Sequence, residues 1–329
     1  MKIVSDILSA TILFAVPLLL VALGGMFSER SGIINIALEG IMIVGALFAC
    51  LTLRSLDLNT SIGQNAPQLG MMIAVLVAAF SGALFSLLLA FASVSLKADQ
   101  TIGGTALNMM APALAIAITW AIQGQGQTNI IIPTWCRITQ ETLGIATKDT
   151  FWQNFLFKSF YQTTIWAALL FIVAAVLLYK TRFGLRMRAC GEHPQAADSV
   201  GINVYRMRYA GVFISGALGG IGGLAYTVAA GSTFQSTVAG YGFLALAVMI
   251  FGNWKPWNIL GASLFFALFK IIGSYSGSIP FLPKFENLNQ SEYLYLMVPY
   301  LVTMILLILT SKRSRAPKSE GIPYDKGRR

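Results

Sequence analysis

The sequence TRFGLRMRACGEHPQAADSVGI, residues 181–202, is the longest polar and basic interruption in the middle of an otherwise apolar chain. It carries the signals of a short helix. Pro194 suits the first helical turn, where its missing N–H costs no hydrogen bond, and Gly201 suits the left-handed position just past the end. The predicted helix, over roughly residues 194–200, has about two turns and is too short to be stable alone in water. We therefore expect it to lie outside a membrane and to pack against the membrane domain or a partner.

On both sides of this stretch the composition is that of an integral membrane protein. Hydrophobic residues make up 56% of the 329 residues, charged residues make up 11%, and the mean hydropathy is +0.70. A soluble globule could not cover this much apolar surface. The net charge of +10 would also suit a nucleic-acid-binding protein. However, the basic residues flank apolar runs and match no nucleic-acid module, so we expect no nucleic-acid partner.

The apolar runs predict the fold class. Only helices or closed barrels satisfy the backbone inside lipid, and these runs are too long for barrel strands. We predict an all-α bundle of about nine spanning helices, with eight or ten as alternatives. They are expected near residues 7–27, 33–53, 71–96, 101–122, 161–180, 207–230, 235–252, 256–276 and 293–311. The charge-free run 209–254 is too long for one crossing, and we expect it to break in the polar, glycine-flanked stretch 231–240.

Basic residues are divided unequally between the two sides of this bundle. The side that holds residues 181–206 carries 16 of the 23 Lys and Arg residues. The positive-inside rule makes that side cytoplasmic, which places the N-terminus outside and the C-terminus inside. This gives a transmembrane domain over 1–311, with a cytoplasmic loop at 181–206 and an outer loop at 123–160, and a basic cytoplasmic tail at 312–329. The outer loop is either an interfacial cap on the bundle or a docking surface for an external partner.

The sequence lacks the residue patterns of a catalytic or metal site. It has no phosphate-binding loop, so we expect no ATP site of the usual kind. His193 has no second imidazole near it and either caps the helix or is a solvated loop residue. Cys50, Cys136 and Cys190 match no metal-ligand spacing. We therefore expect a protein that is not an enzyme and holds no metal or cofactor of its own.

Polar groups inside the apolar runs are the candidates for a pathway through the membrane. Asn35 and Glu39 are four apart in a predicted helix, which would place them on one face about two turns inside the membrane. A carboxylate there costs about 2.5–3.5 kcal/mol unless it is paired or hydrated, so Glu39 is either a gate or pathway residue or a helix-packing hydrogen bond. Asn108, Gln235 and Tyr241 are uncharged groups that could line a passage for a neutral polar solute.

Two further features lie within predicted helices. Gly216, Gly219, Gly220 and Gly223 have the small-xxx-small spacing that lets helices approach closely, and a sliding surface is the alternative interpretation. Lys270 falls deep within its helix, where we expect its side chain to snorkel outward.

Three motifs resemble the permease subunits of bacterial ABC importers of the branched-chain amino acid and simple-sugar superfamily. They are ERSGIINIALEG at 29–40, FGLRMRACGEHPQAA at 183–197 and RAPKSEGIPY at 315–324. The first two are typical of the superfamily, and the third is similar to its nucleoside branch. The similarity in pattern extends over nearly the whole chain.

The resemblance implies a permease subunit in the cytoplasmic membrane that translocates a small neutral polar solute, foremost a nucleoside. The helix at 194–200 would be the coupling helix, which fits a groove on a cytoplasmic ATPase subunit, and Glu192, His193, Pro194, Ala197 and Gly201 occupy that motif here. The resemblance also implies a second related permease and an extracytoplasmic solute-binding protein, often a lipoprotein. ATP and Mg²⁺ would be bound by the ATPase.

Other readings stay open at this point. The solute could instead be a simple sugar or a branched-chain amino acid, and the cation of Lys270, where the family pattern favours neutral or acidic residues, leaves its charge open. An ion-coupled secondary transporter would need a carboxylate or unwound helices in both halves, and the sequence offers only Glu39. A channel would need a ring of like groups and no coupling helix.

Overall fold

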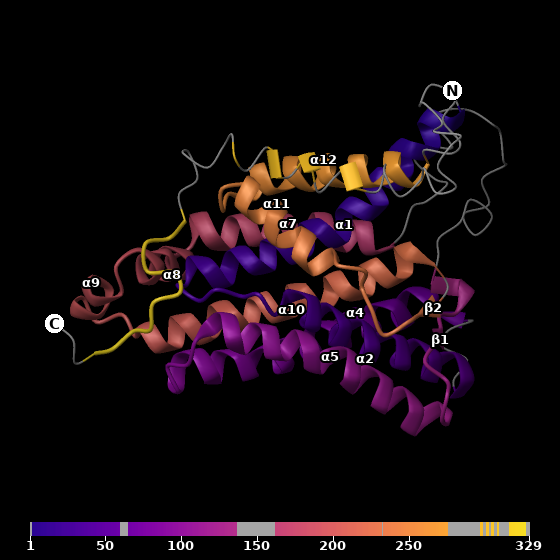
Figure 1. Ribbon diagram of the computed structural model, residues 1–329, viewed down its shortest axis with the longest axis horizontal. Coiled ribbons are helices and arrows are strands. Elements are labelled where there is room, and N and C mark those ends of the chain that lie inside the picture. The colour runs from indigo at the N-terminus through magenta and orange to yellow at the C-terminus, as the bar shows by residue number, and fades with distance from the viewer. Residues whose placement is uncertain are drawn as a thin grey trace.

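The computed structural model describes residues 2–59, 65–136, 162–231, 233–275 and 316–326, with short pieces between 297 and 308. The described part is almost entirely helical, as predicted (Figure 1). It includes seven helices long and apolar enough to cross a membrane: α1 (Lys2–Arg30), α2 (Leu38–Asn59), α4 (Pro67–Ala90), α5 (Gln100–Gln123), α7 (Gln162–Lys180), α10 (Val204–Ala230) and α12 (Pro256–Ser274).

Shorter elements connect these helices. They are the π-helical turn η1 (Phe91–Ser95), the 3-10 turn η2 (Thr134–Cys136), the helices α8 (Arg182–Glu192), α9 (Pro194–Ser199) and α11 (Tyr241–Phe251), and the two-residue strands β1 (Ile130–Ile131) and β2 (Thr233–Phe234). Most of the predicted helix at 293–311 and most of the predicted outer loop at 123–160 lie outside the described residues, so the expected count of nine crossings stays a prediction.

Local sequence signals start several of the helices. Side-chain oxygens of Asp99, Thr181 and Asn203 accept hydrogen bonds from backbone N–H groups in the first turns of α5, α8 and α10. Proline opens α4, α9 and α12, where its missing N–H would have had no helical partner. Because these residues satisfy or remove the free N–H groups of the first turn, the helices can begin directly after short connections.

Helix α10 lies at the centre of the bundle, where it packs against α1, α2 and α4. Glycine makes this packing possible: a Cβ at Gly220 would overlap the Ala78 carbonyl on α4, and a Cβ at Gly82 would overlap the Gly216 carbonyl on α10. On the other side, a Cβ at Gly45 of α2 would overlap the backbone of Gly220. The small-residue spacing therefore marks a seam of close helix packing, as one of the two interpretations predicted.

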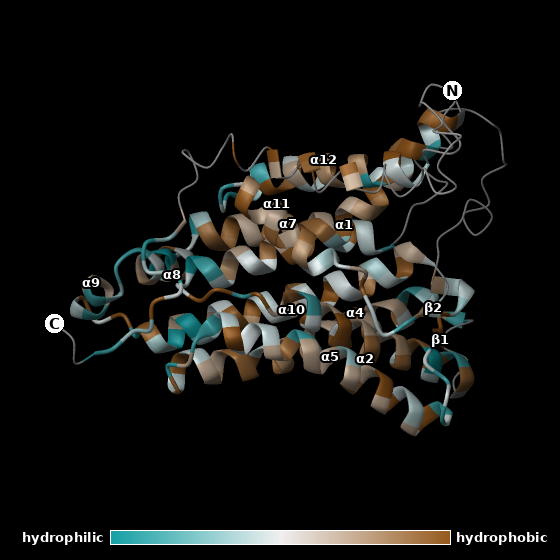
Figure 2. Ribbon diagram, viewed as in Figure 1, coloured by the Kyte–Doolittle hydropathy of each residue, from teal (hydrophilic) through white to brown (hydrophobic). Residues whose placement is uncertain are grey.

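Hydrophobic residues predominate along the helices of the bundle (Figure 2). Large hydrophobic residues of α4 and α7 are exposed, among them Leu76, Phe80, Ile165 and Ile172. Such a surface would be unstable in water and suits lipid chains. The chain is a multi-pass membrane protein.

The first departure from prediction is at residues 33–37, which were expected to begin the helix at 33–53 but belong to a non-helical segment, 31–37. Gly32 has a φ of +98°, which ends α1, and α2 starts only at Leu38. Side chains supply the hydrogen bonds that the missing helical turns would have made. Ser28 Oγ donates to the Ile33 carbonyl at 2.7 Å, and Gln100 Oε1 accepts from the Ile34 N–H at 2.7 Å.

The predicted break lies within 231–240, as expected, and the second departure is the start of the helix that follows it. The helix predicted over 235–252 starts only at Tyr241, after Gly240 in the left-handed conformation, and has 11 residues. At 1.5 Å per residue it is about 16 Å long, roughly half of a 30 Å hydrocarbon core. The residues before it are non-helical, and β2 pairs antiparallel with β1. This crossing is therefore broken, with one half non-helical.

The glycine seam gives a testable expectation. Gly220→Ala should destabilise the bundle by about 1–3 kcal/mol, because a methyl group at this position meets backbone rather than a movable side chain. The measurement is the thermal unfolding midpoint of the purified protein in detergent. Gly261→Ala is the matched control: it is in α12 with no atom within 4 Å of the added Cβ, so it should be neutral or stabilising. Equal midpoints for the two variants would contradict the seam.

Candidate functional site

The side chain of Glu39 joins two helices that both begin inside the bundle. It is the second residue of α2, and its carboxylate oxygens accept hydrogen bonds from the N–H groups of Gly240 at 2.8 Å and Gly242 at 2.7 Å, at the start of α11. The residue is only 8% exposed. A carboxylate at a helix N-terminus satisfies unpaired N–H groups and interacts favourably with the helix dipole. Glu39 therefore caps a helix other than its own.

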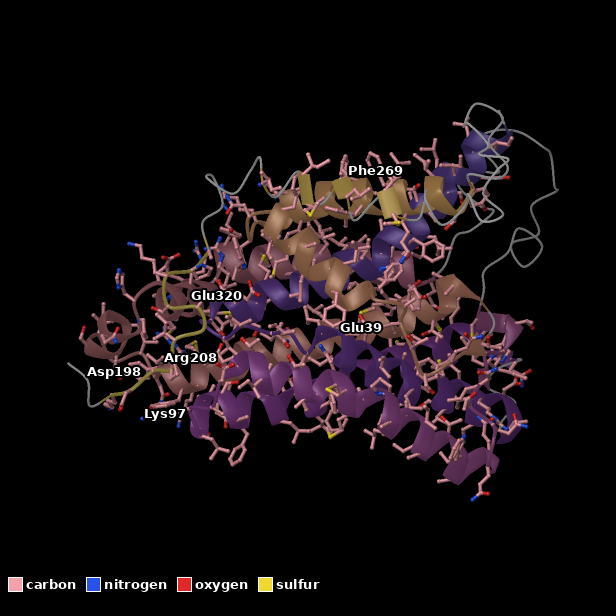
Figure 3. All side chains as sticks on the ribbon, in the orientation of Figure 1. Glu39, Lys97, Asp198, Arg208, Phe269 and Glu320 are labelled. Atoms are coloured by element: carbon pink, nitrogen blue, oxygen red, sulfur yellow. The ribbon has the colours of Figure 1, made fainter. Side chains whose placement is uncertain are left out.

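The depth of this junction follows from the length of α11. Just past its end, the Trp254 carbonyl accepts a hydrogen bond from Arg30 Nη2 at 3.1 Å, so α11 ends level with the end of α1. Its start, about 16 Å away, is near the middle of a membrane. Figure 3 shows Glu39 in the central part of the bundle. Glu39 is deeper than the predicted two turns, because non-helical chain covers up to about 3.3 Å per residue instead of 1.5 Å.

The two asparagines named as pathway candidates both bind polar groups near this junction. Asn35 precedes α2, so the prediction that it shares a helix face with Glu39 is wrong; its Nδ2 donates to Ser215 Oγ on α10 at 2.8 Å. Asn108 on α5 accepts from the Gly40 N–H and donates to the Ile36 carbonyl, both at 2.8 Å. Both amides thus fasten the segment that leads into α2, and a pathway role for them stays a prediction.

The other two pathway candidates lie in and beside the break before α11. Gln235 is exposed, whereas Tyr241 is buried at the start of α11, with the ring centroid of Tyr226 4.4 Å from its own. Lys270 Nζ lies 3.8 Å from the centroid of the Tyr241 ring. The prediction that Lys270 snorkels outward is therefore wrong: its ammonium is held by an aromatic face inside the bundle.

The predicted helix in the central polar stretch is present as α9, six residues from Pro194 to Ser199. Gly201 has the left-handed φ of +83° that its position required. His193 precedes α9, makes no side-chain capping bond and is exposed, so of the two alternatives it is the solvated loop residue. Glu192 is half-exposed, and its carboxylate lies 3.7 Å from Arg30 Nη1.

One face of α9 is buried against the rest of the chain. Ala197 is 3% exposed and packs in a cluster with Cys190, Val204 and Tyr324. The residues that face away from the bundle are Gln195, Ala196, Ser199 and Val200. Ala197 therefore anchors α9, and the outward-facing residues are the ones available to a partner.

Residues 316–326, which we call the C-terminal strap, were expected to be part of a plain basic tail but dock on α8 and on the start of the 31–37 segment. The Ser319 N–H donates to the Gly191 carbonyl at 2.9 Å, and Ser319 Oγ donates to the Glu192 carbonyl at 3.1 Å. The Gly321 N–H donates to the Gly32 carbonyl at 3.3 Å. Ile322 and Tyr324, which are hydrophobic residues within a charged tail, are the feature of the sequence that could have predicted this docking.

The strap also contacts α10 and the turn before α5, through Arg208 and Lys97, which Figure 3 labels at this end of the bundle. Arg208 Nη1 of α10 donates to the Ile322 carbonyl at 2.9 Å, and Lys97 Nζ lies 3.1 Å from an Asp325 carboxylate oxygen. Burial raises the pKa of Glu320 above its ordinary value. The strap thus joins four elements at one end of the bundle: α8, residues 31–37, the turn before α5 and α10.

Among the described residues, no group of His, Cys, Asp and Glu side chains is arranged to hold a metal ion. The arrangement instead combines a carboxylate-capped helix break inside the bundle with an anchored short helix at one end. Neither element contains a nucleophile placed against a base.

Comparison with known proteins points to one kind of protein. Residues 7–308 match the family described as branched-chain amino acid transport system / permease component. The chain is 44% identical to the guanosine ABC transporter permease protein NupQ of Bacillus subtilis, over 100% of this chain and 99% of the relative. It is 40% identical to the nucleoside ABC transporter permease protein NupC of Lactococcus lactis, over 98% and 97% of the two chains. No solved structure matches the chain.

The double hydrogen bond of Glu39 gives the first prediction from this geometry. In Glu39→Gln one amide oxygen can still accept, but the NH₂ group faces the second N–H, so one charge-assisted bond is replaced by a repulsive contact. The variant should lose about 1.5–3 kcal/mol of stability, measured as thermal unfolding in detergent. Thr52→Val, an isosteric change of an α2 residue that bonds only within its helix, should have little effect. Equal stability of Glu39→Gln and wild type would argue against the cap.

The cluster of Cys190, Ala197, Val204 and Tyr324 under α9 leads to a second prediction, which concerns the reactivity of the Cys190 thiol. Burial raises the pKa of Cys190 from 9.0 to about 11, which lowers its thiolate fraction near neutral pH by about a hundredfold. Maleimide should therefore label Cys190 far more slowly than a cysteine placed on the exposed side of α8 by Arg186→Cys. Mass spectrometry of labelled peptides measures both rates, and similar rates would mean that the cluster is open to solvent.

Proposed function

The chain belongs to the branched-chain amino acid transport system / permease component family, and from this premise we propose that it is the membrane-spanning permease subunit of an ATP-driven importer of nucleosides. One observation carries this function: the chain matches a guanosine permease and a nucleoside permease from end to end, at 44% and 40% identity. As a permease subunit it is the non-catalytic part of the transporter. The absence of charge from most of the candidate pathway suits a neutral, hydroxylated solute.

The sides of the membrane follow from the basic residues. α8, α9 and the strap lie at one end of the bundle, opposite β1, β2 and the start of α1 (Figure 1). The end with α8 and α9 carries the excess of Lys and Arg, so it would face the cytoplasm, with the N-terminus outside.

In this orientation α9 is the coupling helix. Its outward residues would enter a groove on a cytoplasmic ATPase subunit, which binds ATP and Mg²⁺, while Pro194 and Ala197 hold it to the permease. Glu192, His193 and Gly201 flank the helix and set where it starts and ends. The chain's own residues therefore transmit movement and perform no chemistry.

Two further partners complete the transporter. A second related permease would pack against this one. Helix α5 offers a face for it, because only six of its 24 residues are buried. A solute-binding protein would dock at the outer end. There a cavity of about 520 Å³ is lined by polar residues that include Arg54, Asp57 and Asn129.

A simple-sugar permease is the alternative within the family, because the chain is also 28% identical to a putative glucose ABC transporter permease protein, TsgC13, of Haloferax volcanii, over 85% of this chain. The two non-helical segments that meet at Glu39 are a feature that ion-coupled secondary transporters use as well. The end-to-end match to nucleoside permeases favours an ATP-driven importer of nucleosides over both alternatives.

The function is tested in proteoliposomes that contain this permease, its partner permease, the ATPase and the solute-binding protein. Radiolabelled guanosine or another nucleoside should accumulate only when ATP is hydrolysed, and no uptake should occur without the ATPase subunit. The control is the same complex with an ATPase that binds but cannot hydrolyse ATP. Uptake by the permease alone under a proton or sodium gradient would contradict the proposal.

A further inference from the structure

We propose that the C-terminal strap is a positioning segment of the coupling device: it holds α9 to α10 and to residues 31–37, so that movement of α9 reaches the Glu39 junction. This rests on the proposed role of α9 in an ATP-driven importer. The strap itself is distinct from the helix that enters the ATPase.

The first step is the contact between strap and coupling helix. α9 has six residues, too few to keep a fixed place through its own hydrogen bonds. Tyr324, only 5% exposed, packs against Ala197 and Cys190, and its hydroxyl is hydrogen-bonded to Asp198 of α9. The strap therefore forms part of the surface against which α9 packs.

The second step is the contact between strap and membrane helices. Arg208 is 1% exposed, and among the described residues its guanidinium has one hydrogen-bond acceptor, the Ile322 carbonyl. A buried cation that loses its acceptor is costly, which favours the docked strap. Because Arg208 is in the first turns of α10, the strap is fixed to the helix at the centre of the bundle.

The third step leads inward. The Gly321 N–H donates to the carbonyl of Gly32, the second residue of the non-helical segment 31–37 that follows α1. That segment ends where α2 starts, one residue before Glu39. A displacement of the strap therefore acts on a short, non-helical connection that leads directly to the cap of α11.

These contacts make one mechanical unit of α9, the strap and residues 31–37. The tilt of α9 that an ATPase imposes would move Tyr324, which packs against Ala197, and would displace Gly321, which is three residues away in the same strap and bonded to Gly32. With the strap released, α9 could move on its own, and ATP hydrolysis would continue without driving transport.

The test is the coupling ratio, nucleoside transported per ATP hydrolysed, in the reconstituted complex. Tyr324→Ala removes the packing against Ala197 and should lower this ratio by roughly fivefold or more, while ATP hydrolysis per assembled complex is kept. Tyr324→Phe retains the ring and should retain most of the ratio. A purely structural role would reduce assembly, transport and hydrolysis together and leave the ratio unchanged, which would overturn the proposal.

A second measurement needs no variant. In hydrogen exchange of the intact complex, the amides of Ser319 and Gly321 should be protected, and their exchange should change together with that of α9 when ATP binds. Exchange of the strap amides at the rate of free peptide, with α9 alone responding, would overturn the proposal even if Tyr324→Ala failed to assemble. A wild-type complex without ATP-driven uptake would instead refute the proposed function. The exchange of the strap amides would still show whether the strap and α9 respond together.

Discussion

The carboxylate of Glu39, held between the N–H groups of Gly240 and Gly242, is the interaction on which the rest of the bundle depends. Of the crossings that the structure describes, that of α11 is only partly helical, and residues 31–37 at the entry to α2 are non-helical as well, so both segments have backbone groups without helical partners. The carboxylate satisfies two of them. It also joins α2 to α11 at the point where both begin, so the two non-helical segments are connected where they end.

The other polar side chains inside the bundle serve the same requirement. Ser28, Gln100 and Asn108 bind backbone groups of residues 33–40, and each comes from a neighbouring helix. Such bonds need helices that are very close, which the glycine seam of α10 allows. The non-helical segment is consequently connected to the helices around it at its inner end, and to the strap at Gly32. In the proposed importer this segment is the link between the cytoplasmic elements and the middle of the membrane.

Much of this architecture could be predicted, because lipid imposes simple rules. Apolar runs predicted spanning helices, a polar stretch predicted the break at 231–240, and Pro194 with Gly201 predicted α9. The break at 31–37 could not be predicted, because the side chains that replace its helical hydrogen bonds come from α5 and from the end of α1. The same holds for Lys270, whose direction is set by the Tyr241 ring, and for the strap, whose partners are backbone carbonyls remote in sequence. The coupling and pathway roles assigned to particular residues stay predictions.

The most direct measurement is a cryo-EM map of the permease in a lipid nanodisc, at a resolution that shows side chains and the two lipid leaflets. We predict that α11 starts at Tyr241 near the bilayer midplane, with the Glu39 carboxylate on the Gly240 and Gly242 N–H groups. A continuous helix across residues 235–252, or a Glu39 side chain directed to lipid or to another subunit, would contradict the account.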